Sequence, residues 1–488
     1  MKKYRAVIAS ILVATGAAWA AQKPNVVLIM TDDLNDYIGA YGHPMVKTPN
    51  IDRLAKEGMV FENAYCQFPL CGPSRNSMMS GLYPDQTHLY TLTHLLRQTH
   101  PDAVTMSQYF QQHGYVSARV GKIYHYMNPN DVGTNGHDDP ASWDERINPK
   151  GVDKDIEAKG LIKSVSSKPG YGGRLSWYAD PANRDEAHTD GMVATESINL
   201  MKKYADKDQP FFLGVGFYRP HTPYVAPKKY FDLYDINTIT VPTVPEGYFA
   251  TLPGPAVQSL TRGTAVAQLS DELAKKSILA YWAAISFVDA QIGRVLDAID
   301  EMGLRENTVI LFSSDHGYHM GEHKHYQKIT LFEESARVPL VISAPSMKNR
   351  GSRTDSLVEM VDFYPTLAEL AGLPAPGKIA GVSMVPVLNN PDTKVRDSAL
   401  TQIKNGHSIR TERYRYTRWQ EGGEKMIELY DWQNDPSEMV NLARNPENRD
   451  LIKKMEALWQ QRVKAASIPP EGVEIKSRSK KGSKNKKG

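Results

Sequence analysis

The chain has 488 residues, of which 41% are hydrophobic and 23% charged. This composition excludes a chain that is disordered throughout, and the length suits one large domain with a smaller partner, or three small domains. The formal net charge of +3 comes from the two ends, because residues 476–488 carry seven positive charges and residues 1–5 carry three. The remaining body has a net charge of −7, so no nucleic-acid partner is indicated.

The two ends of the chain are not expected to belong to the fold. Residues 1–20 combine a positive start, an apolar run over 6–18 and the small-x-small sequence Ala18-Trp19-Ala20, which predicts a signal peptide and a secreted or periplasmic protein. The apolar run is too short to cross a bilayer comfortably, and we expect no membrane span in the rest of the chain. Residues 471–488, rich in Lys, Ser and Gly, are predicted to be a basic disordered tail.

Between these ends, short apolar runs alternate with amphipathic helical stretches. Near-continuous apolar runs are typical of strands buried on both faces. The β–α order predicts an α/β fold over residues 21–390, with a large doubly wound, mostly parallel sheet and helices on both faces. The predicted strands cover 25–30, 116–120, 211–217, 308–312 and 338–342, and the predicted helices cover 51–58, 105–113, 191–204, 275–302 and 361–371.

Two regions depart from this pattern. Residues 129–190 are rich in Gly, Pro and charge, which predicts a long insertion over the active face. Residues 391–470 contain strand-like pieces at 407–410, 413–418 and 426–430 and a helical stretch near 448–465. They are predicted to form a smaller C-terminal α+β subdomain.

Four of the predicted strands end in a polar cluster. Asp32 and Asp33 follow the first strand, Lys122 and His125 the second, His221 the third, and Asp315 and His316 the fourth. Because ligands of open α/β sheets bind at the carboxyl ends of the strands, we expect these side chains to meet in one site.

Cys66 and Cys71 are the only cysteines, and in an exported protein the simplest expectation is a disulfide between them. However, Cys71-Gly72-Pro73-Ser74-Arg75, followed by Met79-Ser80-Gly81, resembles the signature of the type I sulfatases of the alkaline phosphatase superfamily. In that family the cysteine is oxidised to formylglycine (3-oxoalanine). The resemblance implies that Cys71 is the nucleophile precursor, and that a formylglycine-generating or anaerobic sulfatase-maturating enzyme is a partner.

This chemistry gives each part of the motif a reason. A hydrated aldehyde carries two hydroxyls, of which one attacks sulfur and the other later loses its proton so that sulfate is expelled. Pro73 is well placed to start a helix, whose positive end favours an anion beside the modified side chain. The resemblance also implies that Arg75 steadies the nucleophile and the sulfate.

The resemblance implies a metal site made of Asp32, Asp33, Cys71, Asp315 and His316. Three carboxylates favour Ca²⁺ or Mg²⁺ over a soft metal, and we expect one Ca²⁺ per chain. Most of the family has Asn or Gln at the position of His316, whereas some relatives, including iduronate-2-sulfatase, have Asp-His there.

The remaining catalytic roles also follow from the resemblance. Lys122 and Lys328 would hold the sulfate from two sides, His125 would take the proton that allows sulfate release, and His221 would protonate the leaving sugar oxygen. The loop Gly321-Glu322-His323 matches the family as well. His319, His323 and His325 look like a metal-binding cluster, but we expect no second metal there, and contact with substrate is the lesser alternative.

The expected substrate is a sulfated carbohydrate, such as a 2-O-sulfated uronic acid unit. Within the family, residues 84–90, 108–116 and 408–416 resemble iduronate-2-sulfatase, and bacterial polysaccharide sulfatases are similar too. Side chains that could grip the sugar, although each could equally be loop packing, are His94, Arg97, Trp143, Tyr178, Arg184 and His188.

Two other functions stay open at this point. One is a phosphodiesterase or phosphonate monoester hydrolase of the same superfamily, with nearly the same site. The other is a secreted glycan-binding protein without turnover, in which Cys71 stays unmodified or bonds to Cys66.

Overall fold

A computed structural model describes residues 23–166, 171, 173–207, 209–261, 269–345, 347–419 and 426–476. The predicted signal peptide and residues 477–488 of the predicted basic tail lie outside these ranges. Within them, no helix combines the length and the apolar character needed to cross a membrane.

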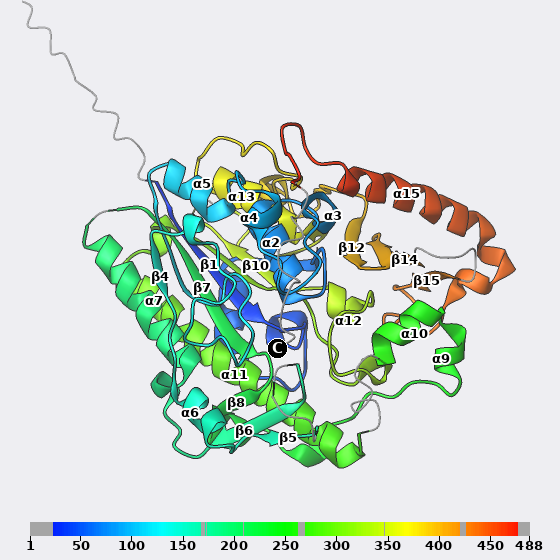
Figure 1. Cartoon of the computed structure of the whole chain (residues 1–488), viewed down its shortest axis with the longest axis horizontal. Coiled ribbons are helices and arrows are strands. Elements are labelled where there is room, and N and C mark those ends of the chain that lie inside the picture. Colours follow the sequence, from blue (N-terminus) through cyan, green and yellow to red (C-terminus); the bar gives the residue numbers. More distant parts are fainter. Residues whose placement is uncertain are drawn as a thin grey trace, which may run out of the picture.

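A large mixed sheet of eight strands organises the molecule (Figure 1). Seven strands run parallel, and β10 runs antiparallel to both of its neighbours. In spatial order the strands are β11 (Ser352–Glu359), β2 (Met59–Tyr65), β10 (Leu340–Ser343), β9 (Thr308–Ser314), β1 (Asn25–Asp32), β7 (Phe211–Pro220), β3 (Val116–Gly121) and β4 (Glu145–Ile147).

The central strand β1 is buried along its whole length because helices cover both of its faces. Val27 and Ile29 pack with α1 (Pro49–Glu57), α7 (Thr189–Ala205) and α11 (Asp271–Glu301) on one face. Alternate residues, including Leu28, pack with α2 (Cys71–Ser80), α5 (Met106–Gln112) and α13 (Phe363–Leu370) on the other. Figure 1 shows the two helix layers on opposite sides of the sheet. Side chains that alternate between two apolar layers explain the continuous apolar run of this strand.

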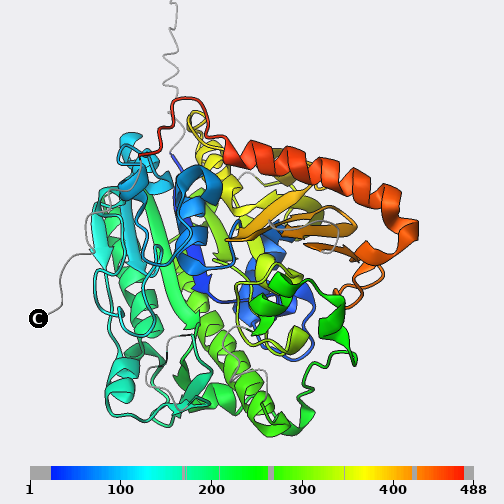
Figure 2. The ribbon, with the colours of Figure 1, turned by 45° about the vertical axis from the view of Figure 1, so that its right-hand side comes forward.

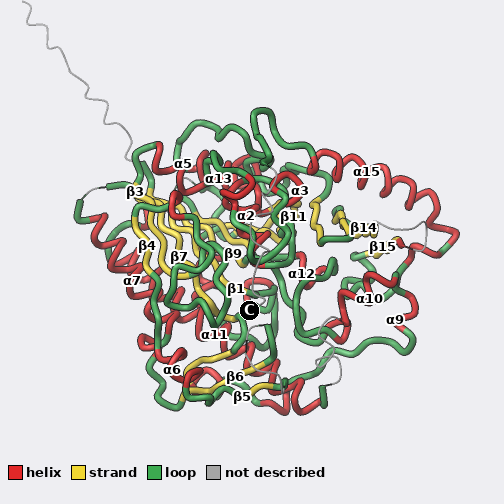
Figure 3. The backbone as a smooth tube through the Cα atoms, in the orientation of Figure 1, coloured by secondary structure: helices red, strands yellow, loops and turns green. Residues whose placement is uncertain are grey.

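The C-terminal part forms a separate, smaller sheet, seen on the right of Figure 3. Its four antiparallel strands follow each other in sequence, and α15 (Arg449–Ser467) packs along them (Figure 2). The strands are β12 (Ala399–Ile403), β13 (Gly406–Arg410), β14 (Tyr414–Trp419) and β15 (Ile427–Asp431).

The region predicted to be an insertion supplies two strands, β5 (Lys163–Ser164) and β6 (Ser176–Asp180), of a third, three-stranded sheet, whose remaining strand β8 (Tyr224–Pro227) comes after β7. The same region also contributes β4, which extends the edge of the large sheet. The remaining helices are α3 (Pro84–Thr87), α4 (Leu96–Thr99), α6 (Val152–Ala158), α8 (Lys228–Phe231), α9 (Tyr248–Thr251), α10 (Gly254–Thr261), α12 (Glu333–Ala336) and α14 (Val385–Asn389).

The predicted fold class is confirmed: a mostly parallel sheet with helices on both faces, and a small C-terminal sheet with a helix. All five predicted strands of the large sheet are present, but the sequence did not indicate β2, β4 or β11. Those three strands form the two ends of the sheet or lie next to an end, and their runs are short or carry polar residues, such as Glu62 and Asn63 in β2.

Candidate active site

Four strands of the large sheet deliver their polar clusters to one place. Asp32 ends β1, Lys122 follows β3, His221 follows β7, and Asp315 follows β9. These strands are neighbours in the order β9-β1-β7-β3, so their carboxyl ends lie side by side. Asp33 turns from the end of β1 with a positive φ of 66°, and its backbone N–H donates to Asp315 Oδ1 at 3.1 Å. The predicted convergence of these clusters is therefore observed.

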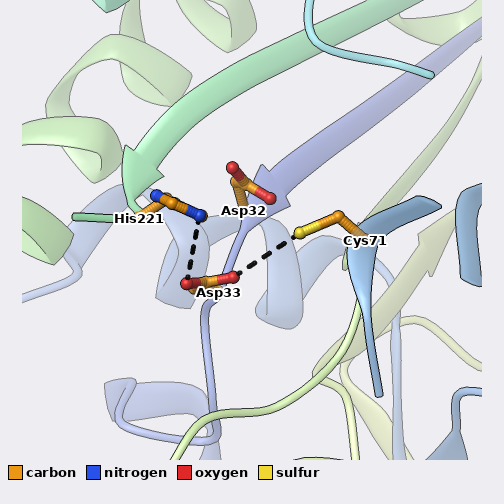
Figure 4. A group of neighbouring side chains, drawn as sticks. All are labelled: Asp32, Asp33, Cys71 and His221. Carbon is orange, nitrogen blue, oxygen red and sulfur yellow. Dashed lines mark hydrogen bonds and ion pairs between the residues drawn. The ribbon is translucent and has the colours of Figure 1, made fainter. Parts of the chain in front are cut away.

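Cys71 enters this site as the first residue of α2, opposite the strand ends (Figure 4). All ten residues of α2 are buried, and the Cys71 side chain lies among charged groups. Its Sγ is 3.2 Å from Lys328 Nζ, 3.3 Å from His316 Nε2 and 4.0 Å from Asp33 Oδ1. The thiol of Cys66 is also free, and it faces the backbone carbonyl of Ser335 at 3.7 Å. The expected disulfide is not formed in this structure.

Arg75 lies one helical turn after Cys71 and is fully buried. It makes five hydrogen bonds: Nε donates to Asp315 at 2.9 Å, Nη2 donates to Asp32 at 3.3 Å, and the other three go to the backbone carbonyls of Thr31, Lys122 and Ile123. These bonds use the five N–H donors of the guanidinium. Arg75 thus ties the ends of β1, β3 and β9 together and orients two carboxylates, whereas the sequence predicts contact with nucleophile and sulfate.

Two overlapping groups of side chains could hold a metal ion. One contains Asp32, Asp33, Cys71 and His221, and the other contains Cys71, Asp315 and His316. His316 Nε2 lies 3.4 Å from Asp33 Oδ1 and 3.5 Å from Asp315 Oδ2, while its Nδ1 pairs with the carbonyl of Gly317 at 2.8 Å. The three buried carboxylates of these overlapping groups provide the hard oxygen ligands that Ca²⁺ or Mg²⁺ prefers, so the donor set fits such an ion.

Two lysines flank the carboxylates. Lys122 Nζ lies 2.5 Å from Asp32 Oδ2, and Lys328 Nζ forms an ion pair with Asp33 and contacts Cys71. Burial alone would lower the pKa of Lys328, but the anionic groups around it, Asp33 foremost, together outweigh burial and raise that pKa well above the usual range. Burial would likewise raise the pKa of Asp32, but the cations around it, Lys122 foremost, hold that pKa well below the usual range. The side chains of Lys328 and Asp32 are therefore both charged at neutral pH.

The two predicted proton-transfer histidines are neutral. Burial lowers the pKa of His221 to about 3 and that of His125 still further. His221 Nε2 lies 3.7 Å from Asp33 Oδ2, and its Nδ1 pairs with the carbonyl of Thr222 at 2.6 Å. Neither ring nitrogen of His125 has a hydrogen-bond partner among the described residues. Both rings can therefore accept a proton, and His221, whose Nδ1 faces a carbonyl, would have to gain one at Nε2 before donating it.

Burial raises the pKa of the Cys71 thiol well above its usual range. The thiol, unlike the thiolate, is a poor nucleophile. In its unmodified form this buried cysteine is therefore protonated and weakly reactive at neutral pH.

The predicted substrate contacts are mostly engaged elsewhere. Trp143 is 5% exposed and packs against Tyr124 and Phe212, and His188 is 1% exposed and pairs with Asp180. Arg97 is held by a two-point ion pair with Asp139. The side chains of Trp143 and His188 are enclosed by packing, which matches the alternative of loop packing, and their contact with a sugar stays a prediction. Arg184 is exposed, and Tyr178 and His94 are partly buried.

The structure adds residues that the sequence did not indicate. Tyr281 of α11 donates to the carbonyl of Asp33 at 2.7 Å and accepts from the N–H of Asn35 at 3.0 Å, which fixes the turn after β1. His137 lies beside His125, with ring centroids 5.7 Å apart. Tyr281 belongs to the apolar face of a helix and His137 to a loop with no pattern, so neither carries a signal in the sequence.

Paired cations, neutral histidines and a metal-compatible carboxylate cluster around one buried side chain are features of hydrolases that cleave anionic esters. The family described as Sulfatase matches residues 24–373, and the one described as N-sulphoglucosamine sulphohydrolase, C-terminal, matches residues 321–465. The chain therefore belongs to the sulfatase family and is a sulfuric ester hydrolase.

Individual relatives agree with this family. A sulfatase of Formosa agariphila is 36% identical over 451 residues, which cover 89% of this chain and 86% of the relative. The iduronate 2-sulfatase of Mus musculus is 33% identical over 388 residues, which cover 72% and 69%. The fold is similar to that of a phosphonate monoester hydrolase from Silicibacter pomeroyi, with a TM-score of 0.75 at 20% identity over 91% of this chain and 96% of that one.

Proposed function

We propose that this protein is an exported sulfatase that removes sulfate from a carbohydrate, such as a 2-O-sulfated uronic acid unit, with a formylglycine made from Cys71. The observation that carries the proposal is the position of the Cys71 side chain at the start of α2, within 3.2 Å of Lys328 and 3.3 Å of His316. The raised pKa of its thiol supports a need for modification, since the thiol itself is a weak nucleophile.

The aldehyde hydrate would supply a hydroxyl for attack on sulfur and a second hydroxyl whose deprotonation releases sulfate. Both hydroxyls would be bonded to the Cβ of residue 71 in place of the sulfur, so the position of Sγ indicates where they would lie. Lys122 and Lys328 would neutralise the sulfate oxygens from two sides. His221 would protonate the departing sugar oxygen, and His125, whose ring nitrogens are unpaired among the described residues, would accept the proton for sulfate release.

One Ca²⁺ is proposed at Asp32, Asp33, Asp315 and His316, next to the Cys71 side chain. Bound there, it would polarise the nucleophile and the sulfate. Arg75 positions two of these carboxylates through its hydrogen bonds and is a positioning residue rather than a sulfate contact.

The carbohydrate substrate is proposed from the relatives, whose names include iduronate 2-sulfatase, and export from the sequence of residues 1–20. Among the expected sugar contacts, which all remain proposed, His94, Arg97, Tyr178 and Arg184 have side chains that are at least partly exposed. Maturation by a formylglycine-generating or anaerobic sulfatase-maturating enzyme belongs to the same proposal.

Mass spectrometry of the tryptic peptide that ends at Arg75, from protein co-expressed with a maturating enzyme, tests the nucleophile. We expect the mass of an aldehyde in place of the Cys71 thiol, together with turnover of sulfated oligosaccharides. Cys71→Ala should abolish turnover, and Cys66→Ser, the matched change at the other buried cysteine, should retain it. An unmodified thiol in an active enzyme would refute the formylglycine.

Rates on matched sulfate and phosphonate esters test the reaction class. A sulfatase hydrolyses the sulfate ester faster, whereas a preference for the phosphonate would favour the alternative of the same superfamily. Binding to sulfated glycans without turnover by the matured protein would favour a glycan-binding protein instead.

A further inference from the structure

Three side chains outside the active site converge on one buried point. They are His319 and His323, in the loop after β9, and Glu334 on α12, and they are close enough for one ligand atom from each to reach a common ion. Both histidine side chains are fully buried, and that of Glu334 is 17% exposed. Glu334 Oε2 lies 3.9 Å from His319 Nδ1 and 3.5 Å from His323 Nε2.

These same three atoms lack hydrogen-bond partners. His319 Nδ1, His323 Nε2 and Glu334 Oε2 are buried, and none has a partner among the described residues. An unpaired buried polar atom costs free energy, and native proteins seldom leave one unsatisfied. Three such atoms facing one another indicate that a group which satisfies all of them at once belongs between them.

The surroundings fix the direction of both rings. His319 Nε2 pairs with Thr330 Oγ1 at 2.8 Å, and His323 Nδ1 pairs with the hydroxyl of Tyr248. The ring of Phe332 stacks on His323 with centroids 4.0 Å apart. Metal-binding histidines are held in this way, with one nitrogen bonded to an outer partner and the other directed at the ion.

We propose that His319, His323 and Glu334 bind a divalent transition metal of the zinc class, separate from the Ca²⁺ site. Imidazole nitrogens with one carboxylate suit zinc rather than calcium. In a tetrahedral zinc site with bonds of about 2.0–2.1 Å, ligand atoms are about 3.4 Å apart, close to the 3.5 and 3.9 Å observed. This revises the expectation from sequence that the histidine cluster binds no second metal. His325 is not a ligand, because its two nitrogens pair with the carbonyls of Leu260 and Lys328.

A cavity of about 250 Å³ borders Glu334, which lines it together with Tyr37, Glu322, Arg337 and Trp432. We take this cavity as the side from which an ion and a water molecule would enter. Three protein ligands leave one position of a tetrahedral ion for that water.

The metal would fasten the loop that carries Lys328. Asp315 and His316 stand at the start of this loop, Lys328 lies between His323 and Glu334 in sequence, and α12 follows it. Glu333, which precedes Glu334 on α12, pairs with Arg415 of the C-terminal sheet. The ion would therefore join the loop to a helix that is held by the C-terminal sheet. The effect on Lys328 rests on the proposed function, whereas the metal site itself does not.

Metal analysis of the full chain tests the proposal. Protein equilibrated with Zn²⁺ in the presence of excess Ca²⁺ should hold one zinc per chain by plasma mass spectrometry. His323→Ala and Glu334→Gln should weaken zinc binding at least tenfold, and Tyr248→Phe, which removes only the outer partner, 10- to 100-fold. His100→Ala, a change at a buried histidine outside the cluster, and Cys71→Ser, which removes the sulfur ligand of the active site, should both retain the zinc.

Anomalous diffraction at the zinc edge, from crystals of the unaltered protein, gives a result that does not depend on how the variants fold. A peak between His319 Nδ1, His323 Nε2 and Glu334 Oε2 is expected. No zinc in the unaltered protein, or a peak only beside Asp32 and Cys71, would overturn the proposal. Because neither measurement uses turnover, failure of the zinc site and failure of the sulfatase mechanism are distinguishable.

Discussion

Arg75→Lys should destabilise the protein strongly although it keeps the positive charge. The guanidinium makes five buried hydrogen bonds, to two carboxylates and three backbone carbonyls. Lysine has three donors on one nitrogen, so at least two of these acceptors lose their partner. Each buried acceptor left unpaired costs about 1–3 kcal/mol, which gives a loss of about 2–6 kcal/mol in the free energy of unfolding.

Urea denaturation at a fixed Ca²⁺ concentration measures this loss, since bound metal adds its own stabilisation to the folded state. Arg53→Lys is the matched control, because its ion pair with Asp297 joins side chains that are 35% and 54% exposed. Exposed pairs contribute about 0–1 kcal/mol. If Arg75→Lys cost no more than Arg53→Lys, the guanidinium would not be holding the strand ends together.

Three further predictions concern proton transfer, metal and pH. His221→Asn should slow the hydrolysis of sugar sulfates far more than that of aryl sulfates with acidic phenols, because only the poor leaving group needs a proton; equal losses on both would remove this role. Treatment with a strong chelator should abolish turnover and added Ca²⁺ should restore it, whereas an active metal-free enzyme would contradict the metal assignment. Burial lowers the pKa of His325 to about 4, so as the pH falls below about 6.5 the unfolded chain takes up a proton that the folded state refuses, and stability is lost. The free energy of unfolding, measured with urea, should fall between pH 7 and pH 4.5 by about 2–3 kcal/mol less in His325→Gln than in the unaltered protein. Identical falls in the two proteins would show that His325 is not responsible.

How much of the fold the sequence predicts depends on how each strand is buried. Strands such as β1 and β7 are apolar on both faces, so their runs stand out and their polar ends mark the site. β11 has the burial of an edge strand, with exposed Arg353 and Asp355 alternating with buried neighbours. Because of these polar residues it has no continuous apolar run that would predict a strand. The antiparallel direction of β10 is set by its position between β9 and β2, which no local pattern encodes.

The residues of the active site also differ in how far the sequence predicts their positions and contacts. Residues joined to a strand end or to the Cys71 motif were placed correctly, because chain position alone brings them to one edge of the sheet. Arg75 was placed correctly, but its partners were not foreseen, since the carbonyls of Thr31, Lys122 and Ile123 become acceptors only when three strands meet. Trp143 and His188 show the limit for sugar contacts: both are enclosed by packing, and residue type alone does not tell such a side chain from one that contacts a sugar.

The charges of the site explain why a metal and an anion belong there together. Asp32, Asp33 and Asp315, when ionised, are balanced by Arg75, Lys122 and Lys328, and burial keeps the neighbouring histidines neutral. Without a metal the site therefore has no net charge, and burial raises the pKa of Asp33, which marks incomplete compensation of its charge. A divalent ion would relieve that carboxylate and leave a surplus of two positive charges, which a sulfate ester with one negative charge offsets only in part. The same surplus would oppose the departure of the doubly charged sulfate product, so inorganic sulfate and phosphate should compete with substrate only when the metal is bound.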